Sequence, residues 1–112
     1  MSGGHFDYNQ YVITQIIDQI QFELDKQGKP NPDFDPSYDT EPNYPFYSEA
    51  VQEQMRSAIV SLTEAHIKTH RLDWFLSGDD SEDTYLKSLN EDLEANNQAN
   101  QLAEFHRTGL IL

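Results

Sequence analysis

The stretch that decides the fold is SEAVQEQMRSAIVSLTEAHIKTHRLDWFL, residues 48–76. Ser48 is a favoured helix N-cap residue, and Glu49 lies in the first turn, where the helix dipole stabilises an acid. The following residues repeat at alternating spacings of four and three, which is typical of a helix that packs on other helices. We call this set the seam: Val51, Met55, Ala58, Leu62, Ala65, Thr69, Leu72 and Leu76. The pattern predicts one long helix, whose seam packs inside one chain or forms a dimer interface.

Just after this helix, the sequence contains a stop signal and a start signal. Gly78 suits the left-handed position that ends a helix, and either Asp79 or Asp80 could cap the next one. Leucines at three- and four-residue spacing predict that next helix over about 80–95. Residues 98–107 are expected to form its continuation or a fourth helix, with Gly109 as the stop and the apolar residues 110–112 packed on the core or a partner. We expect Trp74 to be largely buried near this junction.

Upstream of the long helix, the chain predicts a first helix over about 8–27. An apolar stripe runs along it, with Asp7 as the expected N-cap and Gly28 as the stop. The members of the stripe are Ile13, Ile16, Ile17, Ile20 and Leu24. Phe6 is expected to pack on this helix as a hydrophobic staple. An alternative interpretation makes His5 and Tyr8 a contact patch for a partner.

The connection between the first two helices, residues 28–47, holds all five prolines of the chain. We call it the strap. Proline breaks helices, so the strap is expected to be extended or turning. It is also rich in aromatic residues, which disordered linkers usually lack, so we expect several rings to pack back over the helices. The sequence therefore predicts an all-α single domain over 1–112. Its three or four helices would form a small bundle, wrapped by a Pro-rich, aromatic and acidic strap.

The composition is strongly acidic, with 20 acidic and 7 basic residues and a net charge of −13 over 112 residues. Such a surface repels phosphate backbones, so direct nucleic-acid binding is not expected. It should be attracted to basic protein surfaces. The chain has no cysteine, which excludes disulfides and thiolate metal sites. The sequence shows neither a secretory signal nor an apolar run that could span a membrane, so we expect a cytoplasmic protein.

Few residues form patterns that carry chemistry. His66 and His70 stand four apart on the long helix, with Asp73 nearby, a spacing that could bind zinc with a further ligand. No serine lies in a nucleophile elbow, and no glycine-rich loop precedes a helix in the way phosphate binding requires. We therefore expect no enzyme activity and no cofactor, with a helical metal site as an alternative.

Two stretches, SGGHFDYNQY at 2–11 and RLDWFLSGDDSEDTY at 71–85, together resemble a known group. It consists of small uncharacterised proteins of bacteriophages and bacterial genomes that begin with SGGHF(D/N)Y and carry R-x-DW-x-LSGDD. The resemblance covers about a quarter of the chain and leaves out the strap. It implies a phage or mobile-element context, so the protein would act in the host cytoplasm. It implies no catalytic residue.

The leading hypothesis is a non-catalytic acidic module for protein–protein interaction. It would be a phage-encoded inhibitor or DNA mimic that acts on a host defence or nucleic-acid-processing protein with a basic surface. The candidate contact residues are Asp79, Asp80, Glu82, Asp83, Tyr38, Tyr44, Tyr47, His5 and Tyr8. The alternatives are a metal-binding protein that uses His66, His70 and Asp73, and a structural homodimer with no foreign partner.

Overall fold

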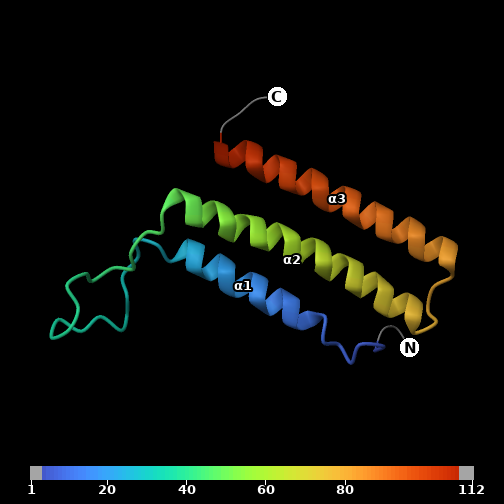
Figure 1. Ribbon diagram of the computed structural model, residues 1–112, viewed down its shortest axis with the longest axis horizontal. Helices are drawn as coiled ribbons and strands as arrows, with labels where there is room; N and C mark the ends of the chain where they lie inside the picture. Colours follow the sequence, from blue (N-terminus) through green and yellow to red (C-terminus); the bar gives the residue numbers. More distant parts are fainter. Residues whose placement is uncertain (1–3, 109–112) are drawn as a thin grey trace.

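The computed structural model describes residues 4–108, except for the side chain of Phe105. Three helices make up most of it: α1 (Tyr11–Asp25), α2 (Glu49–Leu76) and α3 (Glu82–Thr108) (Figure 1). No strand occurs among these residues, so the predicted all-α class is confirmed. The stop expected at Gly109 and the packing expected for residues 110–112 lie outside the described part of the chain.

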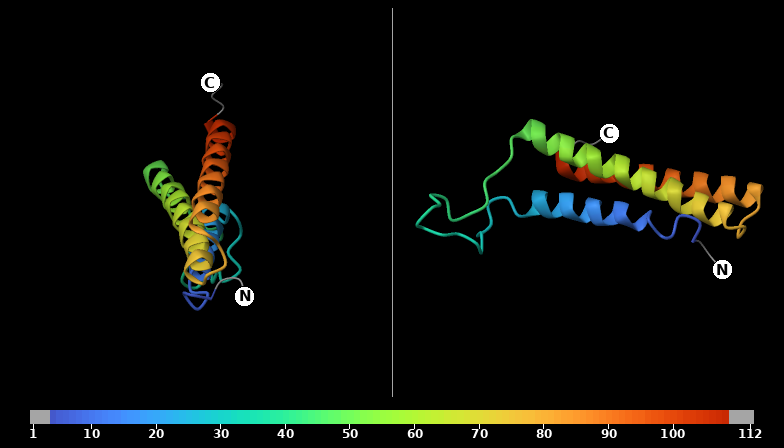
Figure 2. Two further views of the ribbon diagram at one scale, coloured as in Figure 1. Left: turned by 90° about the vertical axis from the view of Figure 1, so that its right-hand side faces the viewer. Right: turned by 60° about the horizontal axis from the view of Figure 1, so that its bottom comes forward.

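The three helices form one open layer with α2 in the middle. α2 runs antiparallel to both neighbours and contacts each of them, whereas α1 and α3 do not contact each other in the described part of the chain (Figure 1). The molecule measures 60 × 40 × 17 Å, so its shortest dimension is less than two helix diameters. α2 and α3 diverge from their shared turn (Figure 2). The small bundle that the sequence predicted is therefore not confirmed: within the described residues the helices form an open layer.

The open layer has no conventional hydrophobic core. Within residues 4–108, no apolar side chain is buried, and the only buried residues are polar: Gln10 with 4% and Asp73 with 0% of their surface exposed. A folded domain normally buries valine, leucine, isoleucine and phenylalanine first. The apolar faces of these helices are therefore only half covered within one chain.

The ends of α2 form as the sequence predicts, because capping depends on neighbouring residues alone. The Ser48 hydroxyl accepts a hydrogen bond from the Val51 amide at 3.2 Å. At the other end, Gly78 has a φ of 84°. The amides of Gly78 and Asp79 donate to carbonyls of the last turn at 3.0 Å, in the Schellman arrangement.

The predicted cap of α3 is wrong by one or two residues. The Ser81 hydroxyl, and neither Asp79 nor Asp80, accepts the hydrogen bond from the Thr84 amide, at 3.2 Å. Ser81 directly precedes the first helical residue and therefore occupies the N-cap position. α3 then runs unbroken to Thr108, so the segment 98–107 is a continuation and not a fourth helix.

The predicted start of α1 is also wrong. The helix begins at Tyr11, three residues after the expected start at Tyr8, and Asp7 does not cap it. Asp7 and Tyr8 instead adopt left-handed conformations, with φ of 53° and 61°. The reason is a long-range interaction of residues 4–10, described below. α1 ends at Asp25, and Gly28 follows with a φ of 77°.

The strap does not wrap the helices as expected but projects beyond the ends of α1 and α2 (Figure 1). Its two arms pair as a short hairpin stem, in which Gly28 donates to the Tyr44 carbonyl and Tyr44 to the Lys29 carbonyl, both at 2.9 Å. Tyr38 is 87% exposed and Phe46 73% exposed. A chain segment with its own stem needs no helical surface to hold its shape.

Only the base of the strap packs on α1. The Tyr47 hydroxyl donates to Glu23 at 2.8 Å, and the Lys26 amine lies 4.4 Å from the centre of the Tyr44 ring. Hydrogen bonds from Lys26 and Tyr47 hold the pKa of Glu23 below its usual value. Of the three tyrosines in the predicted contact set, Tyr44 and Tyr47 therefore anchor the strap, and Tyr38 is free of the helices.

Replacement of Gly28 and Gly78, two of the three glycines with positive φ in the described residues, by alanine tests the base of the strap. A Cβ at Gly28 would lie 2.6 Å from Cζ of Phe46, whereas a Cβ at Gly78 would meet nothing within 4 Å. Gly78→Ala should lower the free energy of unfolding by about 1 kcal/mol from left-handed strain alone. Gly28→Ala should lower the free energy of unfolding by more than Gly78→Ala does, because the Phe46 ring must also move. Urea unfolding of both variants measures the difference, and Phe46→Ala in the Gly28→Ala background should remove it. Equal costs at the two glycines would contradict this account.

Candidate functional site

The most deeply buried polar group in the described residues is a carboxylate that binds the N-terminal segment. We call residues 4–10 the hook. Asp73, in the last turn of α2, accepts hydrogen bonds from the Gly4 amide at 2.9 Å, the Phe6 amide at 3.0 Å and the Gln10 side chain at 3.2 Å. These bonds join the two sequence stretches that carry the family resemblance. The two stretches therefore form one structural unit.

The environment of Asp73 favours its charged form. Burial alone would raise the pKa of this carboxyl group, but the hydrogen bonds from Phe6, Gly4 and Gln10 together outweigh burial and lower it. A buried carboxylate that accepts several amide hydrogen bonds is typically ionised at neutral pH. Asp73 is therefore a charged clamp on the hook, and its oxygens are occupied by these bonds.

The hook is a strained turn that this clamp stabilises. Left-handed backbone costs a residue other than glycine about 1–2 kcal/mol, and Asp7 and Tyr8 both adopt it. Gly4 has a φ of 101°, which glycine adopts without that penalty. Within the hook, the backbone amide of Asp7 donates to the Gly4 carbonyl, and the backbone amide of Asn9 donates to the Phe6 carbonyl. The hook therefore depends on glycine at position 4 and on Asp73 from the other end of the sequence.

Next to the clamp, aromatic and histidine rings form a ladder along the α1–α2 contact. The Tyr11 ring centre lies 5.7 Å from that of His66 and 6.1 Å from that of His70, and the Trp74 ring lies 5.2 Å beyond His70. His66 Nδ1 donates to the Gln10 carbonyl at 3.2 Å. Trp74 is part-buried at this contact, in line with the burial expected from the sequence. The ladder aligns the first turn of α1 against the last half of α2.

The two histidines are part-buried and do not belong to a group of described side chains that could hold a metal ion. Burial lowers the pKa of His70, and the nearby His66 and Arg71 lower it further. Within residues 4–108, no three His, Asp or Glu side chains are grouped so that they could hold a metal ion. Since the Asp73 oxygens bind the hook, the predicted set of His66, His70 and Asp73 does not form a metal site in this structure.

The structure divides the predicted contact residues between the two ends of the molecule. Asp79, Asp80, Glu82 and Asp83 lie at the α2–α3 turn, and the Asp73 clamp holds the hook, with the exposed His5 and Tyr8, at the same end of α2. We call these six residues the acidic end. The strap tyrosines lie at the opposite end of the long axis (Figure 1). The nine residues therefore cannot form one compact surface.

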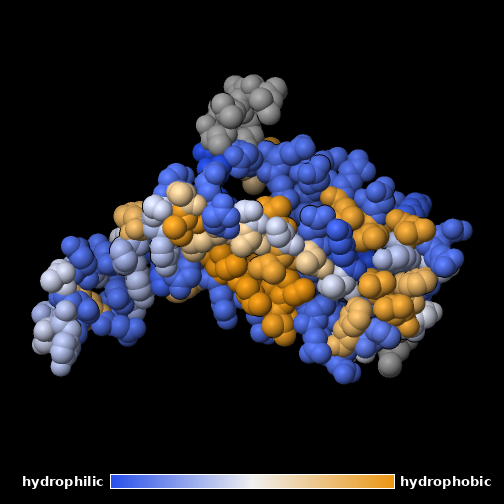
Figure 3. Space-filling model, viewed as in Figure 1, coloured by the Kyte–Doolittle hydropathy of each residue, from blue (hydrophilic) through white to orange (hydrophobic). Residues whose placement is uncertain are grey.

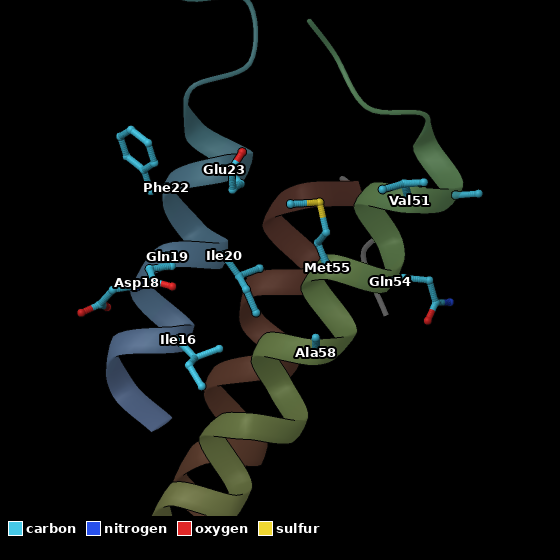
Figure 4. Close-up of a pocket in the computed structure, with 11 residues that line it drawn as sticks. Ile16, Asp18, Gln19, Ile20, Phe22, Glu23, Val51, Gln54, Met55 and Ala58 are labelled. Carbon is cyan, nitrogen blue, oxygen red and sulfur yellow. The ribbon is translucent and has the colours of Figure 1, made fainter. Parts of the chain in front are cut away.

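Sequence reasoning missed an apolar groove between α1 and α2. It has a volume of about 950 Å³, and Ile16 and Ile20 of α1 face Met55 and Ala58 of α2 across it (Figure 4). Apolar side chains gather over α1 and α2 in the space-filling view (Figure 3). The available signal was the isoleucine stripe itself, which marks an apolar face of α1 without showing what covers it.

Comparisons with known proteins add no assignment. No protein-family model, no curated protein and no solved structure matches the chain. A search of the described residues for a helix that is long and apolar enough to cross a membrane finds none.

Proposed function

We propose that the chain is a non-catalytic binding protein whose acidic end docks on a basic surface of a partner protein. The single observation that supports this most directly is the Asp73 clamp. It holds the exposed ring side chains of His5 and Tyr8 at the same end of α2 as the acids of the α2–α3 turn. Acids with neighbouring aromatic anchors form a surface suited to a cationic partner.

Charge supports the class of partner. The net charge of −13 favours attraction to cations over a long range, and Glu82 and Asp83 occupy the exposed first turn of α3. Basic grooves that bind phosphate backbones are the commonest strongly cationic protein surfaces. With the motif resemblance, this favours a phage or mobile-element inhibitor of a host defence or nucleic-acid-processing protein. The strap tyrosines would either contact a second region of a large partner or make no contact with the partner.

Retention of host proteins on the immobilised chain tests the proposal, with two variants of equal charge. Glu82→Gln/Asp83→Asn removes two acids of the acidic end, and Glu91→Gln/Glu94→Gln removes two acids further along α3. We expect a bacterial lysate to yield a nucleic-acid-binding protein that elutes between low salt and about 0.5 M salt, where surface charges are screened. The first variant should retain at least tenfold less of it, and the second about as much as the wild type.

The function of the retained protein provides the decisive readout. Purified wild-type chain should inhibit its binding to nucleic acid in proportion to concentration, and Glu82→Gln/Asp83→Asn should not. Retention that neither salt nor this variant reduces would contradict the proposal.

A further inference from the structure

The single chain exposes far more surface than a self-contained domain of its mass. Its accessible surface is 8104 Å², whereas a folded monomer of 13.0 kDa exposes about 6,300 Å². Its radius of gyration is 18.8 Å, against about 13 Å for a compact domain of this length. The strap contributes to both excesses, but the missing apolar core shows that the helical layer contributes as well.

Part of the exposed apolar surface belongs to α1 and to the two ends of the seam, and another part to Leu86 and Leu102 of α3, which are 60% and 58% exposed. On α1, Val12 is 49% exposed and Ile16 is 41% exposed; on α2, Val51 and Leu76, the first and last members of the seam, are 46% and 45% exposed. The groove lies along the face formed by α1 and α2, with α3 behind it (Figure 4).

The seam faces away from α3. The contacts between α2 and α3 come from Glu53, Arg71 and Phe75, through Arg107, Asp92 and Tyr85 respectively. At 100° per residue, Glu53 and Arg71 lie on the opposite side of α2 from the seam, whereas Phe75 flanks the seam, about 60° from Leu72. No seam position carries a charged residue. The seam is therefore an uncharged stripe about 37 Å long, at 1.5 Å per residue. Its end members Val51 and Leu76 are exposed, and its six middle members are part-buried in the single chain.

We propose that a second copy of the chain covers this face, with the two α2 helices packed antiparallel along the seam. The alternating spacing of the seam reads the same in both directions, so a two-fold axis between Leu62 and Ala65 brings all eight positions into register. Leu62 of one copy then meets Ala65 of the other, and Ala58 meets Thr69. Each contact then occurs twice, as a self-complementary two-fold interface requires, and the small side chains of Ala58, Ala65 and Thr69 allow the two helices to approach closely. The α1 residues Val12 and Ile16 flank the contact.

Area and charge both favour this arrangement. A specific interface needs about 800 Å² from each partner, and the chain exposes about 1,800 Å² beyond the value expected for its mass, an excess that the helical layer shares with the strap. Two chains of charge −13 repel each other, and an antiparallel pair reduces the repulsion because it places the two acidic ends at opposite ends of the dimer. This inference does not depend on the proposed partner, since the acidic end remains exposed.

The mass of the protein in solution tests the dimer. Sedimentation equilibrium at micromolar concentration should give a mass of about twice 13.0 kDa for the wild type. Val51→Lys should weaken association at least tenfold, while Val60→Lys should not. Val60 is the matched control, since it lies on α2 and is 40% exposed but faces away from the seam. Both sites are exposed enough for a lysine in the single chain, and circular dichroism should show unchanged helix content. A monomeric wild type, or equal effects of the two variants, would overturn the proposal and leave the face to a foreign partner.

Cross-linking tests the register. The chain has no cysteine, so Met55→Cys and Leu72→Cys can be made singly and mixed. The antiparallel register places position 55 of one copy beside position 72 of the other, whereas two copies of position 55 lie about 25 Å apart at 1.5 Å per residue. We expect a disulfide between the two variants in the mixture and none in either variant alone. Disulfides between identical positions would overturn the antiparallel register.

Discussion

Asp73→Ala is expected to release the hook and to lower the midpoint of thermal unfolding by roughly 10 °C or more. Asp73 is fully buried and accepts hydrogen bonds from the Gly4 and Phe6 amides and the Gln10 side chain. Without it, these donors lose their partner, and the left-handed residues Asp7 and Tyr8 lose the support for their strain. Circular dichroism measures the midpoint. The matched control is Asp33→Ala on the exposed part of the strap, which should change the midpoint by only 1–2 °C or so.

Two further readouts separate the clamp from a general loss of packing. Hydrogen exchange at the Gly4 and Phe6 amides should accelerate in Asp73→Ala while exchange in the middle of α2 changes least. Asp73→Asn should have an intermediate effect, since an amide oxygen can still accept one of the bonds. Unchanged exchange at both amides would contradict the role assigned to Asp73.

The same clamp predicts a dependence of stability on pH. The pKa of Asp73 is lower in the folded chain than its ordinary value of 3.8, so the folded state favours the charged carboxylate. Its contribution to stability is therefore complete above the unfolded pKa and is lost as the pH falls through the lower folded pKa. Acid unfolding of the wild type should be steeper below pH 3.8 than that of Asp73→Asn. Parallel curves would show that Asp73 is not the relevant group.

Arg71→Ala is expected to lower the free energy of unfolding by about 2 kcal/mol. Arg71 Nε donates to Asp92 of α3 at 2.6 Å, and its guanidinium lies 5.6 Å from the Trp74 ring centre. α3 contacts only α2 in the described part of the chain, so few other interactions compensate. Urea unfolding followed by the fluorescence of Trp74, the single tryptophan, measures the change.

A double-mutant cycle isolates the ion pair from other effects of the substitution. Arg71→Ala and Asp92→Ala should be non-additive, because either one removes the same bond. Lys68→Ala is the control, since the Lys68–Glu64 pair is about half exposed on both sides and should contribute less than 0.5 kcal/mol. Additive effects at Arg71 and Asp92 would contradict a shared interaction.

Features that depend on neighbouring residues were predictable from sequence alone. Both ends of α2 were predicted to within one residue, from the seam, the Ser48 cap and the Gly78 stop. This was possible because helix periodicity and capping involve residues only three or four apart. The all-α class follows from the same short-range pattern. The cap of α3 was misplaced only because Asp79, Asp80 and Ser81 are all good N-cap residues. The choice among them depends on where the turn ends.

The tertiary structure decided what depends on residues far apart in sequence. The hook unwinds the predicted first turn of α1 because Asp73, 63–69 residues away, accepts its hydrogen bonds. The strap forms its own stem and leaves the helices, so the tyrosines and the acidic end occupy opposite ends of the molecule. The sequence by itself determined an all-α class, the position of the long helix and a strongly acidic composition. Only the tertiary structure decided that they form an open layer with an uncovered apolar face. Periodicity identifies an apolar face but does not identify what covers it.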